Sequence, residues 1–174
     1  AKQDCKCKVF IAYMSYRKFS ATHLFTGLEW LDNGHVLIVG PDNRIEAIVP
    51  KAAAGNDIRE LSGILSPGFI NAHVHLELSA MKGLIPTGGG MTHFLLTVMQ
   101  QRPLDPEKIR QAIENAEEEM VRNGIVAAGD ICNTSDTVHQ KQKGKLHYHH
   151  FIELTGFVPS LAGDRYAKGR LLLE

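Results

Sequence analysis

The chain has 174 residues, enough for one ordinary domain or for a small domain and part of a second, and 44% of them are hydrophobic. Its 19 basic and 19 acidic residues cancel, so it lacks the basic excess typical of nucleic-acid-binding and membrane-surface proteins. No apolar run approaches the roughly 18–20 residues of a membrane helix, and we expect neither a nucleic-acid partner nor a membrane.

The N-terminal end differs in character from the rest of the chain. Met14 opens a stretch that has the appearance of a natural start, so residues 1–13 are interpreted as an upstream extension or vector-derived sequence without an assigned fold. Cys5, Cys7 and Cys132 are too few for a disulfide framework, which favours a reducing, cytoplasmic location. No second pair of cysteines or histidines stands at zinc-finger spacing from Cys5 and Cys7, so a metal site there is not expected.

Residues 14–66 have the pattern of a small β-domain. Alternating residues predict a strand within 16–26, and two β-branched runs on either side of Gly40-Pro41-Asp42-Asn43 predict a hairpin. A further short strand is expected within residues 58–69, with a break at Pro67 and Gly68.

From residue 67 onward, strands alternate with helices. The expected strands are residues 68–76, 125–131 and 146–157, and the expected helices are 91–101 and 106–123, with a helix or loop at 135–145 and the beginning of a helix at 164–174. Asp105 is a good N-cap, Pro106 suits the first helical position, and Gly124 is a C-terminal stop. This alternation predicts parallel βα units with right-handed connections.

The segment 69–77 combines an apolar face with an ionisable one. If it is a strand throughout, its even positions are wholly apolar, while His73, His75 and Glu77 share the odd face with Phe69 and Asn71. Ionisable groups buried without partners cost several kcal/mol, and a metal bound by neutral imidazoles would remove that cost. Hydrogen-bonded core histidines are the alternative, but the Pro-Gly turn and the position at a strand end favour Zn²⁺ or Fe²⁺.

These residues resemble a known family. The stretch PGFINAHVHLELS, residues 67–79, is similar to the first barrel strand of the amidohydrolase superfamily, which carries Pro-Gly-Phe-(Ile/Val)-(Asp/Asn)-x-His-x-His. The resemblance extends over residues 14–174. Dihydroorotase-like and hydantoinase-like members tend to place an arginine after the second histidine, whereas Leu76, Glu77, Leu78 and Ser79 follow it here. This looks more like the deaminase and chlorohydrolase branch, and most like aminodeoxyfutalosine deaminases, which act on a purine nucleoside.

The resemblance implies an α/β fold and a partial chain. Residues 67–174 would form the first three βα units of a (β/α)8 TIM-like barrel, incomplete in this chain. Residues 14–66 would be a small β-sandwich-type domain, the N-terminal half of a composite sandwich. A closed barrel takes about 200–250 residues, so the remaining metal ligands and the catalytic acid/base residues are expected beyond Glu174. An open sheet exposes an edge and an apolar face, so these residues alone should be inactive, bind metal poorly, and aggregate or form a homo-oligomer.

The resemblance also implies a reaction on a small-molecule substrate. His73 and His75 would bind one divalent metal, Zn or Fe, whose hydroxide attacks the amidine carbon and releases ammonia. Glu77 is assigned to substrate binding or to orienting the site, with a salt-bridged rim residue as the alternative. The alternatives to a purine-nucleoside deaminase are another amidohydrolase activity, such as a chlorohydrolase or a guanine or cytosine deaminase, and a non-catalytic scaffold or binding protein.

Other candidate residues are identified by their place on predicted strands. Glu153 and Thr155 should lie near the pocket end of the third strand, and Glu153 is predicted to bind substrate. His147 and His149 lie nearer the other end and are interpreted as structural. Asp130, at the end of the second strand, could point into the site or cap the next turn, and the cap is favoured. His93 could touch substrate, but a position on a helix surface is favoured, and Gly88-Gly89-Gly90 lacks the Lys-Ser/Thr of a phosphate loop.

Overall fold

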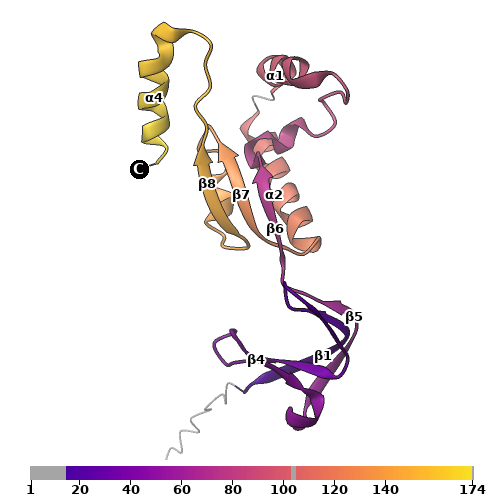
Figure 1. Cartoon of the computed structure of the whole chain (residues 1–174). Helices are drawn as coiled ribbons and strands as arrows, with labels where there is room; N and C mark the ends of the chain where they lie inside the picture. The colour runs from indigo at the N-terminus through magenta and orange to yellow at the C-terminus, as the bar shows by residue number, and fades with distance from the viewer. Residues whose placement is uncertain (1–14, 103–104, 174) are drawn as a thin grey trace, which may run out of the picture. The chain divides into compact units, whose positions relative to one another are not determined.

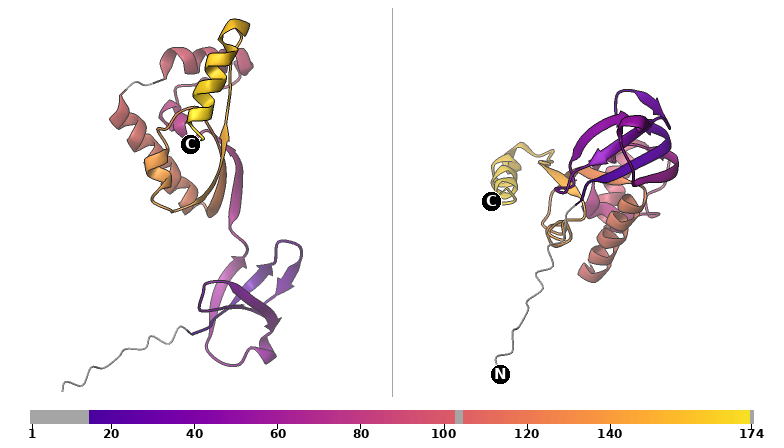
Figure 2. Two further views of the ribbon diagram at one scale, coloured as in Figure 1. Left: turned by 90° about the vertical axis from the view of Figure 1, so that its left-hand side faces the viewer. Right: turned by 90° about the horizontal axis from the view of Figure 1, so that it is seen from below.

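The computed structural model describes residues 15–102 and 105–173, which form two compact units that divide between Pro67 and Gly68 (Figure 1, Figure 2). Residues 1–13, interpreted from the sequence as an extension, and the pair Cys5 and Cys7 lie outside the described residues. Within the described ranges, no helix combines the length and hydrophobicity that crossing a membrane requires.

The first unit is a five-stranded sheet with β1 at its centre. The strands are β1 (Arg17–Phe25), β2 (Trp30–Asp32), β3 (His35–Val39), β4 (Ile45–Pro50) and β5 (Ile58–Leu65), with a 3₁₀ turn η1 (Lys51–Ala53) after β4. β1 pairs antiparallel with β2 and β3 and parallel with β5, and β4 pairs antiparallel with β3. Ala21, Leu24 and Val36 form its buried centre.

The predicted hairpin in this unit is confirmed. β3 and β4 are joined through Gly40, whose N–H donates to the carbonyl oxygen of Arg44 at 2.8 Å. Asn43 has a φ of 66°, a left-handed conformation that asparagine adopts more readily than most residues. The turn residues therefore fix this pair of strands locally.

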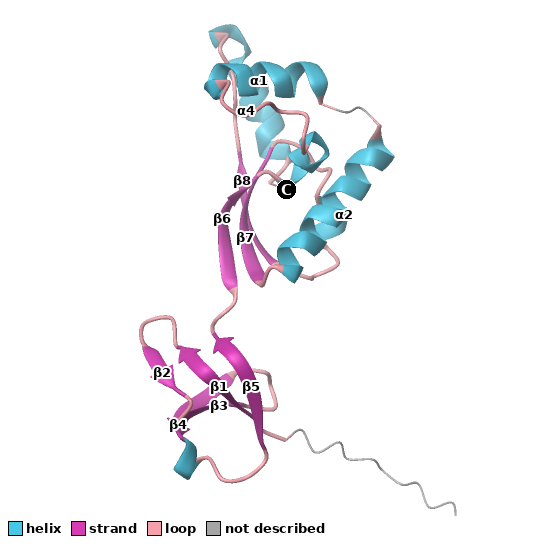
Figure 3. Cartoon of the chain, turned by 90° about the vertical axis from the view of Figure 1, so that its right-hand side faces the viewer, coloured by secondary structure: helices cyan, strands magenta, loops and turns pink. Residues whose placement is uncertain are grey.

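The second unit alternates strands and helices, as expected. Its elements are β6 (Phe69–Val74), η2 (Leu76–Met81), α1 (Gly90–Gln101), α2 (Pro106–Arg122), β7 (Ile125–Cys132), α3 (Val138–Lys141), β8 (His147–Ile152), η3 (Pro159–Leu161) and α4 (Ala162–Leu171). The strands form one parallel sheet in the order β6-β7-β8, and α2 lies on one face of it (Figure 3). Over the described residues the sheet is open, so a closed barrel is not formed.

The helix α2 begins and ends where the sequence predicts. The Asp105 side chain accepts hydrogen bonds from the N–H groups of Glu107 and Lys108, and Pro106 is the first helical residue. Gly124 comes after the helix with a φ of 78°, in the left-handed region that favours glycine. Ile113 is buried on the side of α2 that faces the sheet, which anchors this layer.

The prediction for β6 is wrong in two respects. The strand ends at Val74, so His75 and Glu77 lie beyond it, and the pairing with β7 is irregular between Asn71 and Val74. Asn71 and Val74 consequently both line a small cavity against α2. The even positions are not uniformly packed under helices, because the Ile70 side chain is 69% exposed. A register shift thus replaces the strict alternation expected from the sequence.

Candidate metal centre

His73 and His75 lie together at the carboxyl end of β6. Their ring centroids are 5.2 Å apart and the ring planes are inclined by 53°. His73 is exposed, and His75 is half-buried beside a cavity of about 690 Å³ between η2 and α2. In the described part of the chain, neither ring forms a hydrogen bond; the backbone N–H of His73 donates to Asn71 Oδ1 at 3.3 Å, and the His75 carbonyl oxygen accepts from the N–H of Leu78 at 2.9 Å. Both imidazoles therefore keep their nitrogens available.

The spacing of the two rings fits ligation of one ion. Two imidazoles bound to a tetrahedral zinc at about 2.0–2.1 Å place their ring centroids roughly 5 Å apart. The observed centroid separation of 5.2 Å is consistent with that value. The carboxyl ends of parallel strands are also where βα-barrel proteins place their chemistry.

Glu77 lies in the interior and not on the rim. Its side chain is 3% exposed and forms part of η2, which packs against α2. Its Oε2 atom accepts hydrogen bonds from the N–H groups of Asn133 at 3.0 Å and Thr134 at 2.9 Å, and from the Thr134 hydroxyl at 2.8 Å. The carboxylate is thus occupied by the loop after β7.

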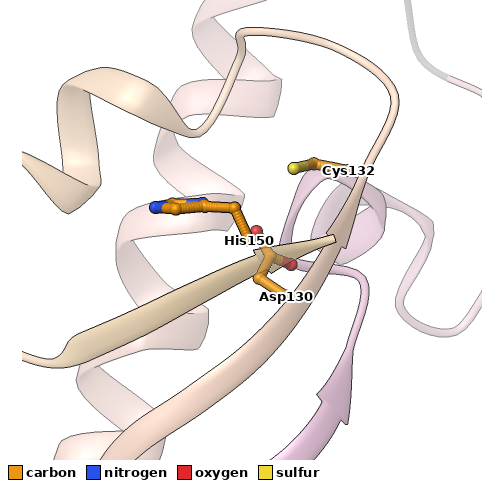
Figure 4. Close-up of side chains that lie close together, drawn as sticks. All are labelled: Asp130, Cys132 and His150. Carbon is orange, nitrogen blue, oxygen red and sulfur yellow. The ribbon is translucent and has the colours of Figure 1, made fainter. Parts of the chain in front are cut away.

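A second group of potential ligands lies on the sheet face that α2 and α3 cover, which we call the helix face. Asp130 and Cys132 from β7 and His150 from β8 place one ligand atom each within 4.8 Å of one another (Figure 4). However, the Lys141 ammonium nitrogen lies 2.5 Å from Asp130 Oδ2 and 2.9 Å from His150 Nδ1. The lysine cation therefore already holds the position that a metal ion would need.

The ionisable groups around Lys141 respond to burial. Asp130 is completely buried, and its Oδ1 atom accepts a hydrogen bond from the N–H of Leu76 at 2.9 Å. Burial raises the pKa of the Cys132 thiol. Burial and the neighbouring Lys141 ammonium lower the pKa of His150. The expectation that Asp130 caps the next turn is wrong, because its partners are in η2 and α3.

The helix face holds a second buried carboxylate. Glu117 of α2 is completely buried, and it accepts hydrogen bonds from the Tyr148 hydroxyl at 2.9 Å and from the side-chain amide of Gln140. Burial, together with the bond to Glu117, raises the pKa of Tyr148. The sequence pattern drew attention to the histidines of β8 and missed Glu117, whose only local signal is an acidic residue among the apolar positions of α2.

The remaining predicted residues lie on other elements than the histidine pair. Glu153 comes directly after β8 and is exposed; its N–H donates to the Cys132 carbonyl oxygen at 3.2 Å. His147 and His149 are exposed, and the His149 ring packs edge-on against Phe151 with ring centroids 4.7 Å apart. His93 is exposed on α1, in agreement with the helix-surface position expected for it. A substrate role for Glu153 remains a prediction.

Parallel strands joined by helices, with two free imidazoles where the first strand ends, define an α/β protein that carries its candidate site at a strand end. Residues 64–170 match the model of the Amidohydrolase family, and the chain belongs to this family. The chain is 27% identical over 135 residues to an aminodeoxyfutalosine deaminase from Nitratiruptor sp., covering 72% of this chain and 33% of the relative. It therefore spans about a third of the length of that curated relative.

Solved structures show the same fold. Helicobacter pylori aminofutalosine deaminase in complex with methylthio-coformycin matches with a TM-score of 0.72 and 22% identity, over 90% of this chain and 40% of that one. A variant of atrazine chlorohydrolase from Arthrobacter aurescens TC1 in complex with zinc and atraton matches with a TM-score of 0.61 and 18% identity, over 82% of this chain and 37% of that one. At these identities the likeness establishes the fold alone.

Proposed function

We propose that the protein to which this chain belongs is a metal-dependent aminohydrolase, and that His73 and His75 are two ligands of one divalent metal, zinc or iron. The observation that carries the proposal is the 5.2 Å separation of two imidazoles that lack protein partners in the described residues. The zinc in a chlorohydrolase of similar fold supports the choice of metal. A metal at this position would lower the pKa of a bound water, so that hydroxide is available near neutral pH.

The chain's own residues would bind and orient in this reaction. His73 and His75 would present neutral imidazole nitrogens from the end of β6, and the open sheet would be the first part of a (β/α)8 barrel. Residues 14–66 would form one half of a composite sandwich domain, and Glu153 would contact substrate beside the end of β8. The further ligands and the groups that move protons would belong to later strands, outside these 174 residues.

The substrate we propose is a purine-nucleoside-like molecule with an exocyclic amine. Support comes from the aminodeoxyfutalosine deaminase with 27% identity and from the sequence after His75, where the carboxylate-binding arginine of other branches is absent. Such a substrate would lose its amine as ammonia when water adds to the amidine carbon.

The test is an ammonia-release assay on the full-length protein, purified with its metal. The panel is aminodeoxyfutalosine, adenosine, S-adenosylhomocysteine and guanine, with chloride release from chloro-triazines measured in parallel. We expect ammonia from a purine nucleoside, lost on chelation and restored by zinc or iron. The proposal fails if the metal-loaded protein releases no ammonia from this panel, if it releases chloride instead, or if chelation leaves the rate unchanged.

A further inference from the structure

The segment after His75 is attached to the end of β7 by two buried carboxylates. Glu77 Oε2 accepts from the N–H groups of Asn133 and Thr134, which lie 56 and 57 positions away in the sequence. In the opposite direction, Asp130 Oδ1 accepts from the N–H of Leu76 at 2.9 Å. These reciprocal bonds, which we call the carboxylate clasp, join the ends of two neighbouring strands.

The clasp also reaches the helix α1. The second oxygen of Glu77, Oε1, lies 3.6 Å from the Arg102 guanidinium at the end of α1. Arg102 in turn bonds Asp136 Oδ2 at 3.0 Å. The Thr134 hydroxyl lies 2.8 Å from Glu77 and 2.9 Å from Asp136, and its single proton serves one of the two at a time. Glu77 thus connects η2, the loop after β7 and the end of α1.

The buried carboxylate of Glu77 is unfavourable for folding unless its hydrogen bonds compensate for the loss of water. Its neighbours Leu76 and Met81 are apolar and almost completely buried, so a packing role alone would be served by an apolar side chain. Burying a charged group costs several kcal/mol, which hydrogen bonds to the charged form offset. Hydrogen bonds specify direction, which apolar contacts do not. Here the hydrogen bonds of Glu77 fix the backbone two residues after His75. The carbonyl oxygen of His75 also accepts a hydrogen bond from the N–H of Leu78 at 2.9 Å.

We propose that Glu77 is a positioning residue for the metal centre: its clasp onto the loop after β7 holds His75 at chelating distance from His73. The inference rests on the proposed function, since it assumes that the two histidines bind a metal. β6 ends at Val74 and its pairing with β7 is irregular between Asn71 and Val74, so His75 lies beyond the last paired residue of the strand. The clasp supplies the restraint that the sheet does not.

The expected effect is on metal affinity more than on folding. A glutamine at position 77 keeps the size and shape of the side chain, but its neutral oxygen accepts weaker hydrogen bonds than a carboxylate does. Its NH₂ group would also face the Arg102 guanidinium, which is itself a donor. Residues that orient metal ligands from outside the coordination sphere typically change affinity by about 10–100-fold when they are replaced. We expect Glu77→Gln to weaken zinc binding by about tenfold.

The chain offers a matched control in Glu117. This glutamate is also completely buried and hydrogen-bonded in the second unit, but its partners, Tyr148 and Gln140, lie on the helix face. Glu117→Gln removes the same charge and should lower the thermal midpoint of the metal-free protein while leaving zinc affinity within about twofold of wild type. Thr134→Val is a milder variant that removes the hydroxyl donor to Glu77, and we expect about a threefold loss of affinity.

The experiment measures the dissociation constant of Zn²⁺ alone, by competition with a chromophoric chelator, in full-length wild-type protein and the three variants. The thermal midpoint of each metal-free protein is measured alongside. Weaker binding in Glu77→Gln and Thr134→Val but not in Glu117→Gln supports the inference; if Glu77→Gln does not fold, Thr134→Val and Glu117→Gln decide it. Equal weakening in all three, or wild-type affinity in Glu77→Gln, overturns the positioning role and leaves the proposed function intact. A wild-type protein that binds no zinc overturns both.

Discussion

Two groups of potential metal ligands lie in the parallel sheet, one on β7 and β8 and one at the end of β6, and they differ in what surrounds them. On the helix face, Asp130, Cys132 and His150 offer three ligand types within 4.8 Å, and Lys141 lies among them. At the end of β6, His73 and His75 offer only two rings, and neither has a hydrogen-bonded partner in the described part of the chain.

The difference teaches that residue types do not define a metal site unless the position between them is free. The Asp130 carboxylate already has a cation beside it, and the Lys141 side chain that supplies this cation is itself 7% exposed. Removing one partner of a buried ion pair strongly destabilises the fold, so the Asp130–Lys141 pair has a structural role. The histidine pair has the opposite character, because its nitrogens lack partners and lie where βα proteins carry their chemistry.

The largest effect is expected when the helix-face pair is broken. Asp130→Asn leaves the Lys141 ammonium buried without its counter-charge, and we expect the free energy of unfolding to fall by about 3–5 kcal/mol. Denaturant unfolding measures this change. The control is Arg110→Gln, which breaks the exposed pair with Glu107 and should leave the free energy of unfolding almost unchanged. Equal losses in the two variants would show that the Asp130–Lys141 pair is not buried as described.

An intermediate effect should result if the lysine itself is removed. Lys141→Ala takes the cation away from Asp130, Cys132 and His150, and we expect this variant to acquire a second metal site there. Cobalt(II) added to the variant should produce a thiolate-to-metal absorption band, since Cys132 would become a ligand. The wild-type protein should lack this band. A thiolate band in the wild type would mean that the metal displaces Lys141, and the contrast between the two clusters would be wrong.

The smallest effect concerns the pH dependence of stability. Burial and Lys141 lower the pKa of His150, and Asp130 opposes them. Between the lowered value and the ordinary value of about 6.5, the unfolded chain binds more protons at this residue than the folded chain. Stability should therefore decrease as the pH falls below about 6.5, and His150→Gln should reduce this decrease slightly. An NMR titration that places the midpoint of His150 at or above about 6.5 would contradict the prediction.

Features fixed by local residue chemistry could be predicted from the sequence. Asp105 and Pro106 determine where α2 begins, and the turn at Gly40 determines the hairpin, because capping and turn geometry depend on a few adjacent residues. The match to the family model agrees with the resemblance carried by residues 67–79, while metal ligation by His73 and His75 stays a prediction.

Features that depend on distant partners could not be predicted. The period-two pattern continues past Val74, but β6 ends there, and the N–H of Leu76 bonds to Asp130, 54 positions away. The buried position of Glu77 was missed for the same reason, since its partners come after β7. The parallel pairing of β1 with β5 and the ion pair formed by Lys141 are also long-range, and no local signal specifies them.

The most direct measurement is the metal content of the full-length protein in three forms: wild type, His73→Asn with His75→Asn, and Cys132→Ser with His150→Gln. We predict about one equivalent of zinc or iron in the wild type, almost none in the first double variant, and an unchanged content in the second. Metal that survives loss of the histidine pair and disappears with Cys132 and His150 would contradict the assignment of the metal centre to the end of β6.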